Sequence, residues 1–166
     1  MNKSKFVANL KEWLVIIAIF SVTFALLTVG LHFIRFPSVD GVSMYPTYQD
    51  GSQLVVLYTT QAKAGDVIVI WSDELDEYIV KRIIGIGGDH IEIKDSGFYL
   101  NGNKLDEDYI YEQNWIKDSD SLDITVPQDQ VFVMGDNRNM SVDSRAIGTL
   151  PVSDIFGRVL FENTFF

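Results

Sequence analysis

The 166-residue sequence contains no cysteine and only two histidines. Without cysteine, disulfide bonds and thiolate chemistry are both excluded. Extracytoplasmic domains without disulfide bonds are common in some bacteria, so this absence excludes no compartment.

Charge is absent from one long stretch, since no Asp, Glu, Lys or Arg occurs among the 22 residues from Trp13 to Ile34. At 1.5 Å per residue this run makes about 33 Å of helix, enough to cross a hydrocarbon core of about 30 Å. A buried core helix would show a polar stripe, which is lacking here. A cleaved signal peptide would have an apolar region of about 7–15 residues and a small-x-small cleavage site. We therefore predict an uncleaved transmembrane anchor over 13–34.

Charge on the two sides of this run predicts its orientation. Residues 1–12 carry three lysines and Glu12, a net of +2, so the chain's −10 leaves −10 − 2 = −12 for the remainder. Positive flanks stay on the cytoplasmic side. We predict a cytoplasmic N-terminus (1–12) and an extracytoplasmic acidic domain (35–166) in a single-pass cell-membrane protein. Its charge indicates no nucleic-acid partner.

Short runs rich in Val, Ile, Phe and Tyr follow the anchor, each bounded by Gly, Asp, Asn or Pro. They predict strands at 52–60, 66–72, 77–86, 90–95, 97–102, 130–135 and 157–163. The Asn-Gly pair in "LNGNKL" indicates a hairpin. No stretch after residue 35 shows a sustained helical period, which predicts a mainly β domain of partly closed sheets. The acidic, aromatic stretch 103–125 is predicted to be a long exposed loop or a lid over part of the sheet.

One serine draws attention in "VDGVSMYPTYQDG", residues 39–51. Gly41 permits a backbone twist or a close approach, and Pro46 keeps Tyr45 extended or turned. Ser43 between them is able to present its hydroxyl and its backbone N–H together. The ordinary interpretation is a turn residue, and a serine nucleophile also requires a base.

Two residues outside the anchor are candidate bases. In "EYIVKRII" the strand period places Lys81 on one face with Ile79 and Ile83, and Arg82 on the other. An apolar face desolvates the amine, lowers its pKa from about 10.4 and makes it a proton acceptor. The alternatives are a lysine that snorkels at a sheet edge and His90 as the base, although His90 also fits a half-exposed strand position.

A third group of polar residues stands in "MGDNRNMSVDSRAIG", residues 134–148. Alternating acids and arginines indicate a loop held by charge-assisted hydrogen bonds, and Ser141 is able to bond an active-site amine. "GIGGD" (85–89) lacks a following Lys-Ser/Thr and opens no helix, so nucleotide binding is rejected. "DELDE" (73–77) lacks the spacing of a Ca²⁺ loop. No cofactor or metal is predicted.

Three segments in this order resemble the bacterial type I signal peptidases, membrane-anchored serine proteases that cleave signal peptides from exported preproteins. They are "SMYPT" (43–47), "KRIIGIGGD" (81–89) and "GDNRNMSVDSR" (135–145). "GDVIVI" and "FYLNGNKLDEDYI" also look like family segments, so with the anchor the resemblance covers nearly the whole chain. It implies an antiparallel β-sheet domain of the signal-peptidase kind.

The resemblance implies a role for each matching position. Ser43 would be the nucleophile and Lys81 the general base, a Ser–Lys dyad. Ser141 would orient the Lys81 amine, while Asp143 and Arg145 would brace the loop.

Two further expectations concern charge. Asp136 would pair with Arg82 and leave Lys81 without a salt-bridge partner, whereas a carboxylate beside Lys81 would raise its pKa. The backbone N–H of Ser43 would form part of the oxyanion hole. Some members add a hydroxyl two residues before the nucleophile, where this chain has Gly41.

Departures from the family pattern remove no catalytic atom. Gly87 replaces a proline, and Asn139 and Met140 replace Asp-Asn. The implied partners are exported preproteins cut after an Ala-x-Ala pattern and bound as an added strand on a shallow apolar surface. The bilayer would hold the enzyme close to the secretion translocase.

Two alternatives stand beside this interpretation. A self-cleaving Ser–Lys protease of the SOS-repressor type shares the dyad and a related fold, but would carry a DNA-binding region instead of an anchor. A catalytically silent, membrane-tethered homologue would act as a binding or scaffold protein.

Overall fold

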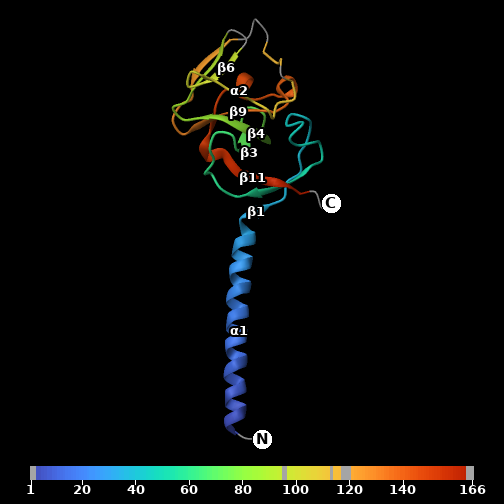
Figure 1. Cartoon of the computed structure of the whole chain (residues 1–166), viewed down its shortest axis with the longest axis vertical. Coiled ribbons are helices and arrows are strands. Elements are labelled where there is room, and N and C mark those ends of the chain that lie inside the picture. The colour runs from blue at the N-terminus through green and yellow to red at the C-terminus, as the bar shows by residue number, and fades with distance from the viewer. Residues whose placement is uncertain (1–2, 95–96, 113, 117–120, 164–166) are drawn as a thin grey trace. The chain divides into compact units, whose positions relative to one another are not determined.

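The computed structural model describes residues 3–94, 97–112, 114–116 and 121–163. The chain divides into two units, residues 1–34 and residues 35–166 (Figure 1). Residue 95 of one predicted strand, and residues 113 and 117–120 of the predicted loop, lie outside the described residues.

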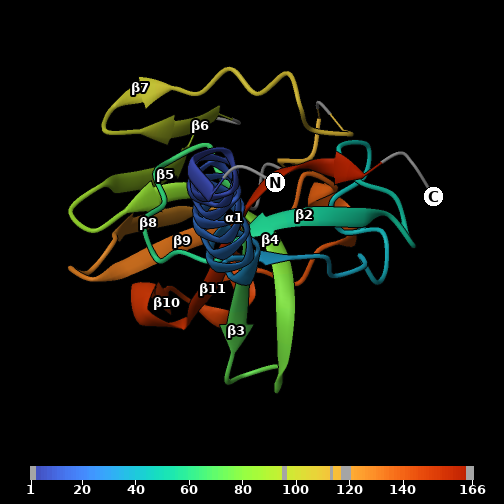
Figure 2. The ribbon, with the colours of Figure 1, turned by 90° about the horizontal axis from the view of Figure 1, so that it is seen from below.

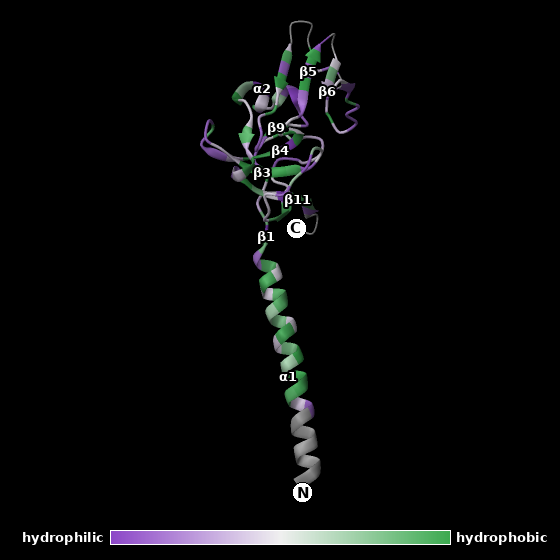
Figure 3. Ribbon diagram, turned by 90° about the vertical axis from the view of Figure 1, so that its left-hand side faces the viewer, coloured by the Kyte–Doolittle hydropathy of each residue, from purple (hydrophilic) through white to green (hydrophobic). Residues whose placement is uncertain are grey.

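The first unit contains the helix α1 (Lys3–His32). Its 21-residue stretch Glu12–His32 is long and apolar enough to cross a membrane, a test that a signal sequence near the N-terminus also passes. Figure 3 shows this apolar character along the stretch. Thr23 and Thr28 donate hydrogen bonds of 2.9 Å to carbonyls one turn back, which satisfies their hydroxyls within the helix. The helix ends two residues before the predicted 34.

The second unit is built from two sheets whose pairings are antiparallel. The larger has the order β1 (Ile34–Arg35), β2 (Gln53–Leu57), β11 (Ile155–Asn163), β3 (Val67–Ser72), β4 (Glu77–Ile86), β9 (Gln130–Met134) and β10 (Leu150–Pro151). The smaller has the order β7 (Asn103–Lys104), β6 (Gly97–Leu100), β5 (His90–Lys94) and β8 (Leu122–Thr125), which lie side by side in Figure 2. The mainly β prediction is confirmed, and each predicted strand is present with ends shifted by a few residues.

Short helical turns complete the second unit: η1 (Arg138–Met140), α2 (Ser144–Ile147) and η2 (Val152–Asp154). The first two follow β9 and lie within the polar motif of residues 134–148. Asp143 caps α2 by accepting a hydrogen bond from the Arg145 N–H at 3.3 Å, as Asp often does at a helix start.

Alternation along β4 positions the candidate base. β4 lies between β3 and β9, with Lys81 opposite Ile68 and Arg82 opposite Met134. Ile79 and Ile83 are buried with β3 and β9 side chains. The strand therefore directs Lys81 and Arg82 to opposite faces of the sheet, as its sequence period predicts.

The stretch 103–125, predicted to be a long exposed loop or a lid over part of the sheet, is irregular between β7 and β8, and many of its described residues are exposed. Ile110 and Trp115 are buried in an apolar cluster with Phe98 of β6, and Glu107 is buried too. β7 and β8 add strands to the smaller sheet at its two ends. The acidic composition concealed these apolar residues because their spacing follows neither a helical nor a strand period, so the exposed-loop prediction was wrong for them.

Candidate active site

Ser43 lies on the loop between β1 and β2, held on both sides. Gly41 has a φ of +84°, a conformation that glycine adopts without the penalty of a side chain, and its N–H donates to Asp50 Oδ1 at 2.8 Å. Met44 is fully buried among apolar residues that include Leu54 and Val56 of β2. Burying such a side chain stabilises by about 1.5–3 kcal/mol, which anchors the residue next to Ser43.

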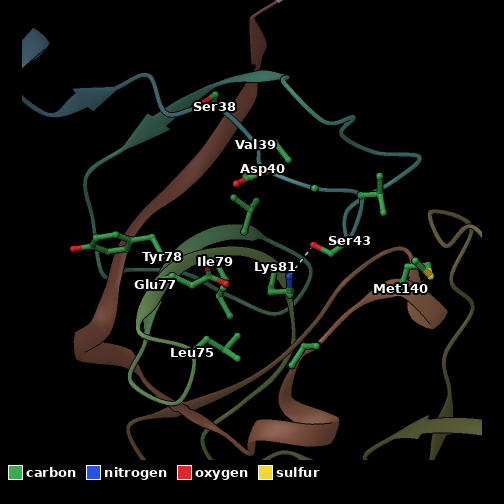
Figure 4. A pocket seen from close by; sticks show the side chains of 14 residues that line it. Ser38, Val39, Asp40, Ser43, Leu75, Glu77, Tyr78, Ile79, Lys81 and Met140 are labelled. Atoms are coloured by element: carbon green, nitrogen blue, oxygen red, sulfur yellow. Dashed lines mark hydrogen bonds between the residues drawn. The ribbon is translucent and has the colours of Figure 1, made fainter.

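Lys81 reaches this loop from β4. Its Nζ donates a hydrogen bond to Ser43 Oγ at 2.8 Å, and Figure 4 shows the amine and the hydroxyl facing each other. Lys81 is only 5% exposed, so it does not snorkel into solvent as the edge-strand alternative would require. The structure therefore brings together the two residues that the first two motifs single out.

Burial lowers the pKa of the Lys81 amine because desolvation disfavours its charged form. The carboxylates of Asp143, Glu77 and Asp136 act in the opposite direction and do not overcome it. A lysine in this state is a better proton acceptor than an exposed one.

Arg82 pairs with a carboxylate of the third motif, that of Asp136. Its Nε and Nη2 donate to Asp136 Oδ1 and Oδ2 at 2.8 and 2.7 Å, and Asp136 is fully buried. Thr47 donates to the same carboxylate. This two-point pairing is the strong form of an arginine–carboxylate bond, and it neutralises the charge of Asp136.

Asp143 is the centre of the loop that follows β9. Its carboxylate accepts from Arg145 Nε at 2.8 Å, from Gly135 N–H at 3.0 Å and from Ser141 Oγ at 2.7 Å. Burial acts to raise the pKa of Asp143, but the hydrogen bonds and charge of Arg145, with Gly135 and Ser141, leave that pKa lowered. Asp143 is thus ionised and braced.

Ser141 has a different partner from the one that the resemblance implies. Its hydroxyl proton goes to Asp143, and within the described residues no hydrogen bond joins Ser141 to Lys81. A hydroxyl has one proton, and an ionised carboxylate is its strongest acceptor. Ser141 still lies near Ser43, because a Cβ at Gly135 would overlap both Ser141 Oγ and the Ser43 carbonyl oxygen.

The two candidate donors for an oxyanion hole, at Ser43 and at Gly41, differ in whether they are already hydrogen-bonded. No hydrogen bond of the described residues uses the Ser43 N–H, so this donor is available to a developing oxyanion. Gly41 has no side-chain donor, and its N–H is already engaged by Asp50. The Ser43 carbonyl accepts from Asn137 N–H at 3.0 Å, which ties the serine loop to the third motif.

A cavity of about 330 Å³ opens beside the dyad between the Ser43 loop and β4. Its lining consists of residues 38–43, Leu75, residues 77–81, Met140 and Val142. Figure 4 shows that both elements contribute side chains to it. Apolar side chains such as Val39 and Ile79 line the same cavity as the dyad, which suits small uncharged substrate side chains.

His90 is occupied elsewhere. Its Nε2 lies 2.8 Å from Asp123 Oδ1, on the exposed face of the smaller sheet, and it does not line the cavity. His90, Asp123 and Glu92 are the group of possible metal ligands in the described part of the chain, and their ligand atoms lie within 4.8 Å of one another. Glu92 lies near Nδ1 of the His90 ring and Asp123 lies near Nε2, so no single ring nitrogen faces both carboxylates.

Sequence reasoning assigned no role to Glu107 and Arg138, a buried pair in which Arg138 Nη1 donates to Glu107 Oε2 at 2.8 Å. The signal was present in "EDYIY" (107–111), where Glu107, Tyr109 and Tyr111 alternate. Acidic surface loops carry such residues often, so the pattern by itself indicated nothing.

Comparison with known proteins decides the family. The family model described as signal peptidase, peptidase S26, matches residues 10–163. The chain belongs to the signal peptidase family. Signal peptidase I of Bacillus licheniformis is 38% identical over 148 residues, covering 82% of this chain and 78% of that protein. Signal peptidase IB of Staphylococcus aureus is 35% identical over 174 residues, covering 93% and 89%.

The crystal structure of a signal peptidase I from Enterococcus faecalis V583 superposes with a TM-score of 0.51 at 29% identity, covering 59% of this chain and 96% of that one. This signal peptidase is therefore a serine endopeptidase with the family's antiparallel β fold, acting in signal-peptide removal. The family match decides against the SOS-repressor alternative.

Proposed function

We propose that this signal peptidase cleaves exported preproteins with Ser43 as nucleophile and Lys81 as general base. The observation that carries the proposal is the 2.8 Å hydrogen bond between a buried amine and a loop serine beside a cavity. A neutral amine both donates and accepts, so the same approach allows the proton of Ser43 Oγ to pass to Lys81 Nζ.

The reaction follows from these positions. Ser43 Oγ attacks the scissile carbonyl while Lys81 takes its proton, and the Ser43 N–H faces the resulting oxyanion. The tetrahedral intermediate collapses, the Lys81 ammonium returns the proton to the leaving amine, and an acyl-enzyme remains. Lys81 then deprotonates a water molecule that attacks the ester, and the released Ser43 oxygen recovers the proton.

Substrate choice is proposed to depend on the cavity. A preprotein segment would lie as an added strand between residues 38–43 and β4, making backbone hydrogen bonds. Side chains of the first and third residues before the cut would enter the apolar lining, which favours the Ala-x-Ala pattern. The exposed carboxylates of Asp40 and Glu77 also line this cavity.

Location is part of the proposal. Residues 13–34 would anchor the enzyme in the bilayer, with residues 1–12 cytoplasmic and residues 35–166 extracytoplasmic. The uncharged apolar stretch and the net positive segment before it support this topology. An anchored enzyme would meet preproteins as they leave the translocase.

Mass spectrometry tests the proposed chemistry. The detergent-solubilised full chain is incubated with a preprotein or a peptide that contains one Ala-x-Ala site. We expect one cut after the second alanine, lost by about 10⁴-fold or more in Ser43→Ala and Lys81→Ala, and unchanged in His90→Ala. No cut by a folded wild type would favour a silent homologue. Cutting that survives Lys81→Ala but not His90→Ala would make His90 the base.

A further inference from the structure

Residues 107–111 lie outside the three motif segments, yet they contact all three. Tyr111 contacts Tyr45 of the first segment, Tyr109 contacts Arg82 of the second, and Glu107 contacts Arg138 of the third. Residues 108 and 109 form a turn rather than a strand, and across this turn each of the three side chains reaches a different motif segment. Residues 107–111 carry none of the proposed catalytic side chains, yet they contact the segments that carry Ser43 and Lys81 and the segment that follows β9.

Tyr109 covers the arginine next to the proposed base. The Arg82 guanidinium carbon lies 4.1 Å from the centroid of the Tyr109 ring, within the range of a cation–π contact. The phenol donates to Glu107 Oε1 at 2.8 Å. Burial, and then the negative charge of Glu107, raise the pKa of Tyr109, so the phenol remains neutral and keeps its proton for this bond.

Glu107, at the start of the segment 107–111, binds Arg138 of the third motif. It is 7% exposed, and both its oxygens accept from the guanidinium of Arg138, which is 1% exposed. The same guanidinium lies over the ring of Trp115 at 4.8 Å, and its Nε donates to the Gly135 carbonyl at 3.1 Å. Glu107 therefore connects the segment to the start of the loop after β9 through a buried ion pair.

Tyr111 adds two contacts. Its backbone N–H donates to the Asp136 carbonyl at 3.0 Å, and its ring meets that of Tyr45 edge to face at 4.8 Å. Asp136 is held by its carbonyl here and by its carboxylate on Arg82. The segment thus touches both partners of the Arg82–Asp136 pair.

We propose that Glu107, Tyr109 and Tyr111 form a positioning strap that holds Arg82 on Asp136, so that the charge of Asp136 stays neutralised beside the dyad. The inference rests on the proposed function, because it matters only if Lys81 is the base. The three residues touch neither substrate nor reacting atoms, and they act through Arg82 and the loop after β9.

The charges around the dyad show why this would affect catalysis. Three carboxylates act on Lys81: Asp143, which Arg145 neutralises, Asp136, which Arg82 neutralises, and Glu77 at the cavity. Around Arg82 itself stand Asp136, Tyr109 and Tyr48. Arg82 Nη1 also donates to the Gly65 carbonyl at 2.9 Å, so Arg82 stays near Asp136 without the Tyr109 ring. Loss of the ring would remove the cation–π contact and weaken the Arg82–Asp136 pair, and the less neutralised charge of Asp136 would favour the ammonium form of Lys81.

The test is the pH dependence of kcat/KM in the full chain carrying Tyr109→Leu, with Tyr109→Met as a second variant that fills the space more flexibly. Tyr99→Leu is the matched control, because Tyr99 is also half-buried and lies under a cation, Lys94, 5.2 Å from its centroid. The acidic limb is the part of the kcat/KM profile that rises with pH as Lys81 loses its proton. We expect this limb to move to higher pH by about one unit in Tyr109→Leu and Tyr109→Met, which is at the low end of the effect of one nearby charge on a pKa. At neutral pH this is a loss of about tenfold that recovers at alkaline pH.

Tyr109→Phe keeps the ring over Arg82 and is expected to keep the wild-type limb. An equal loss at every pH in Tyr109→Leu and Tyr109→Met, or a limb that moves as far in Tyr99→Leu, would overturn the strap. If both Tyr109 variants fail to fold while Tyr109→Phe and Tyr99→Leu fold, the ring is a structural element and the strap is overturned as well. A wild type that does not cut, or a Ser43→Ala variant that still cuts, would instead overturn the proposed function.

Discussion

Arg82 and Asp136 meet through two hydrogen bonds of 2.8 and 2.7 Å, although Arg82 is the direct neighbour of Lys81 in β4. Adjacent strand residues face opposite sides of a sheet. One basic side chain is thereby paired with a carboxylate and the other with a serine hydroxyl. This division allows a cation and a proposed neutral base to stand side by side in one sequence motif.

Removing Arg82 is expected to destabilise the fold. Arg82→Met leaves the fully buried Asp136 carboxylate without its cation, a change that costs about 3–5 kcal/mol. Denaturant unfolding of the detergent-solubilised chain measures it. Arg158→Met serves as the control, because Arg158 is more exposed and lies 3.7 Å from Asp66, a surface pair worth about 0–1 kcal/mol. Adding Asp136→Asn to Arg82→Met should restore part of the loss, and an equal loss in all three variants would contradict this account.

Activity is expected to rise with pH through the lowered pKa of Lys81. The base must be neutral, so kcat/KM should increase about tenfold per pH unit below that pKa and level off above it. Because burial depresses the pKa of Lys81 below its usual 10.5, the rise should be centred below that value. A limb centred at 10.5 or higher would mean that the amine is not desolvated as its burial indicates.

Glu77 provides a second probe of the same group. Its charge acts to raise the pKa of Lys81, so Glu77→Gln should move the acidic limb to lower pH. Glu77 is exposed, and solvent limits the shift to a few tenths of a unit. Glu74 is an exposed glutamate of the turn that precedes β4, and Glu74→Gln should leave the limb in place. A shift of the same size in both variants would mean that only net charge matters.

Gly135 marks the closest approach between the serine loop and the loop after β9. A Cβ there would overlap the Ser43 carbonyl oxygen and Ser141 Oγ, so Gly135→Ala must push the two loops apart. We expect a loss of about 1–3 kcal/mol in stability and about 100-fold in kcat/KM, as for a misplacement near 1 Å. Gly30→Ala is the control, since a Cβ at Gly30 meets no atom within 4 Å. Full activity in Gly135→Ala would show that this approach is not needed for catalysis.

Local sequence patterns predicted most of the fold and the centre of the site. Alternation placed Lys81 on the buried face of its strand, and the strand signals located β3, β4 and β9 to within a residue or two. These properties depend only on neighbours along the chain. The strand β8, in contrast, lies within an acidic stretch and forms by pairing with β5, a partner distant in sequence.

The sequence also did not predict which hydrogen-bond or ion-pair partner a polar side chain takes. The motif positions of Ser141 and Asp143 left open which acceptor the Ser141 hydroxyl prefers, and the structure assigns it to Asp143 rather than Lys81. The Glu107–Arg138 pair was equally invisible, because a buried ion pair between residues 31 positions apart leaves no periodic signal. Composition describes the acidic segment as solvent-exposed, whereas burial of Ile110 and Trp115 and the pairing of Glu107 with Arg138 hold it against the domain.

The buried amine of Lys81 is expected to reduce stability at neutral pH. Its folded pKa is lowered, so between that value and the unfolded value of about 10.4 the unfolded chain binds more protons than the folded one. Wild-type stability therefore rises with pH across this window. Lys81→Met keeps the length of the side chain without the charge, and should raise Tm at pH 7 by a few degrees.

The gain should shrink as pH approaches 10.5 and vanish above it, because Lys81 is then neutral in both states and its burial no longer costs ionisation. Thermal unfolding of the detergent-solubilised full chain at about pH 7, 8.5 and 10 measures this trend. Lys104→Met, at an exposed position of β7, should show no such trend, which separates burial from loss of a positive charge. A gain for Lys81→Met that grows with pH would require an ammonium stabilised by Asp143, Glu77 and Asp136, and would exclude Lys81 as a base activated by desolvation.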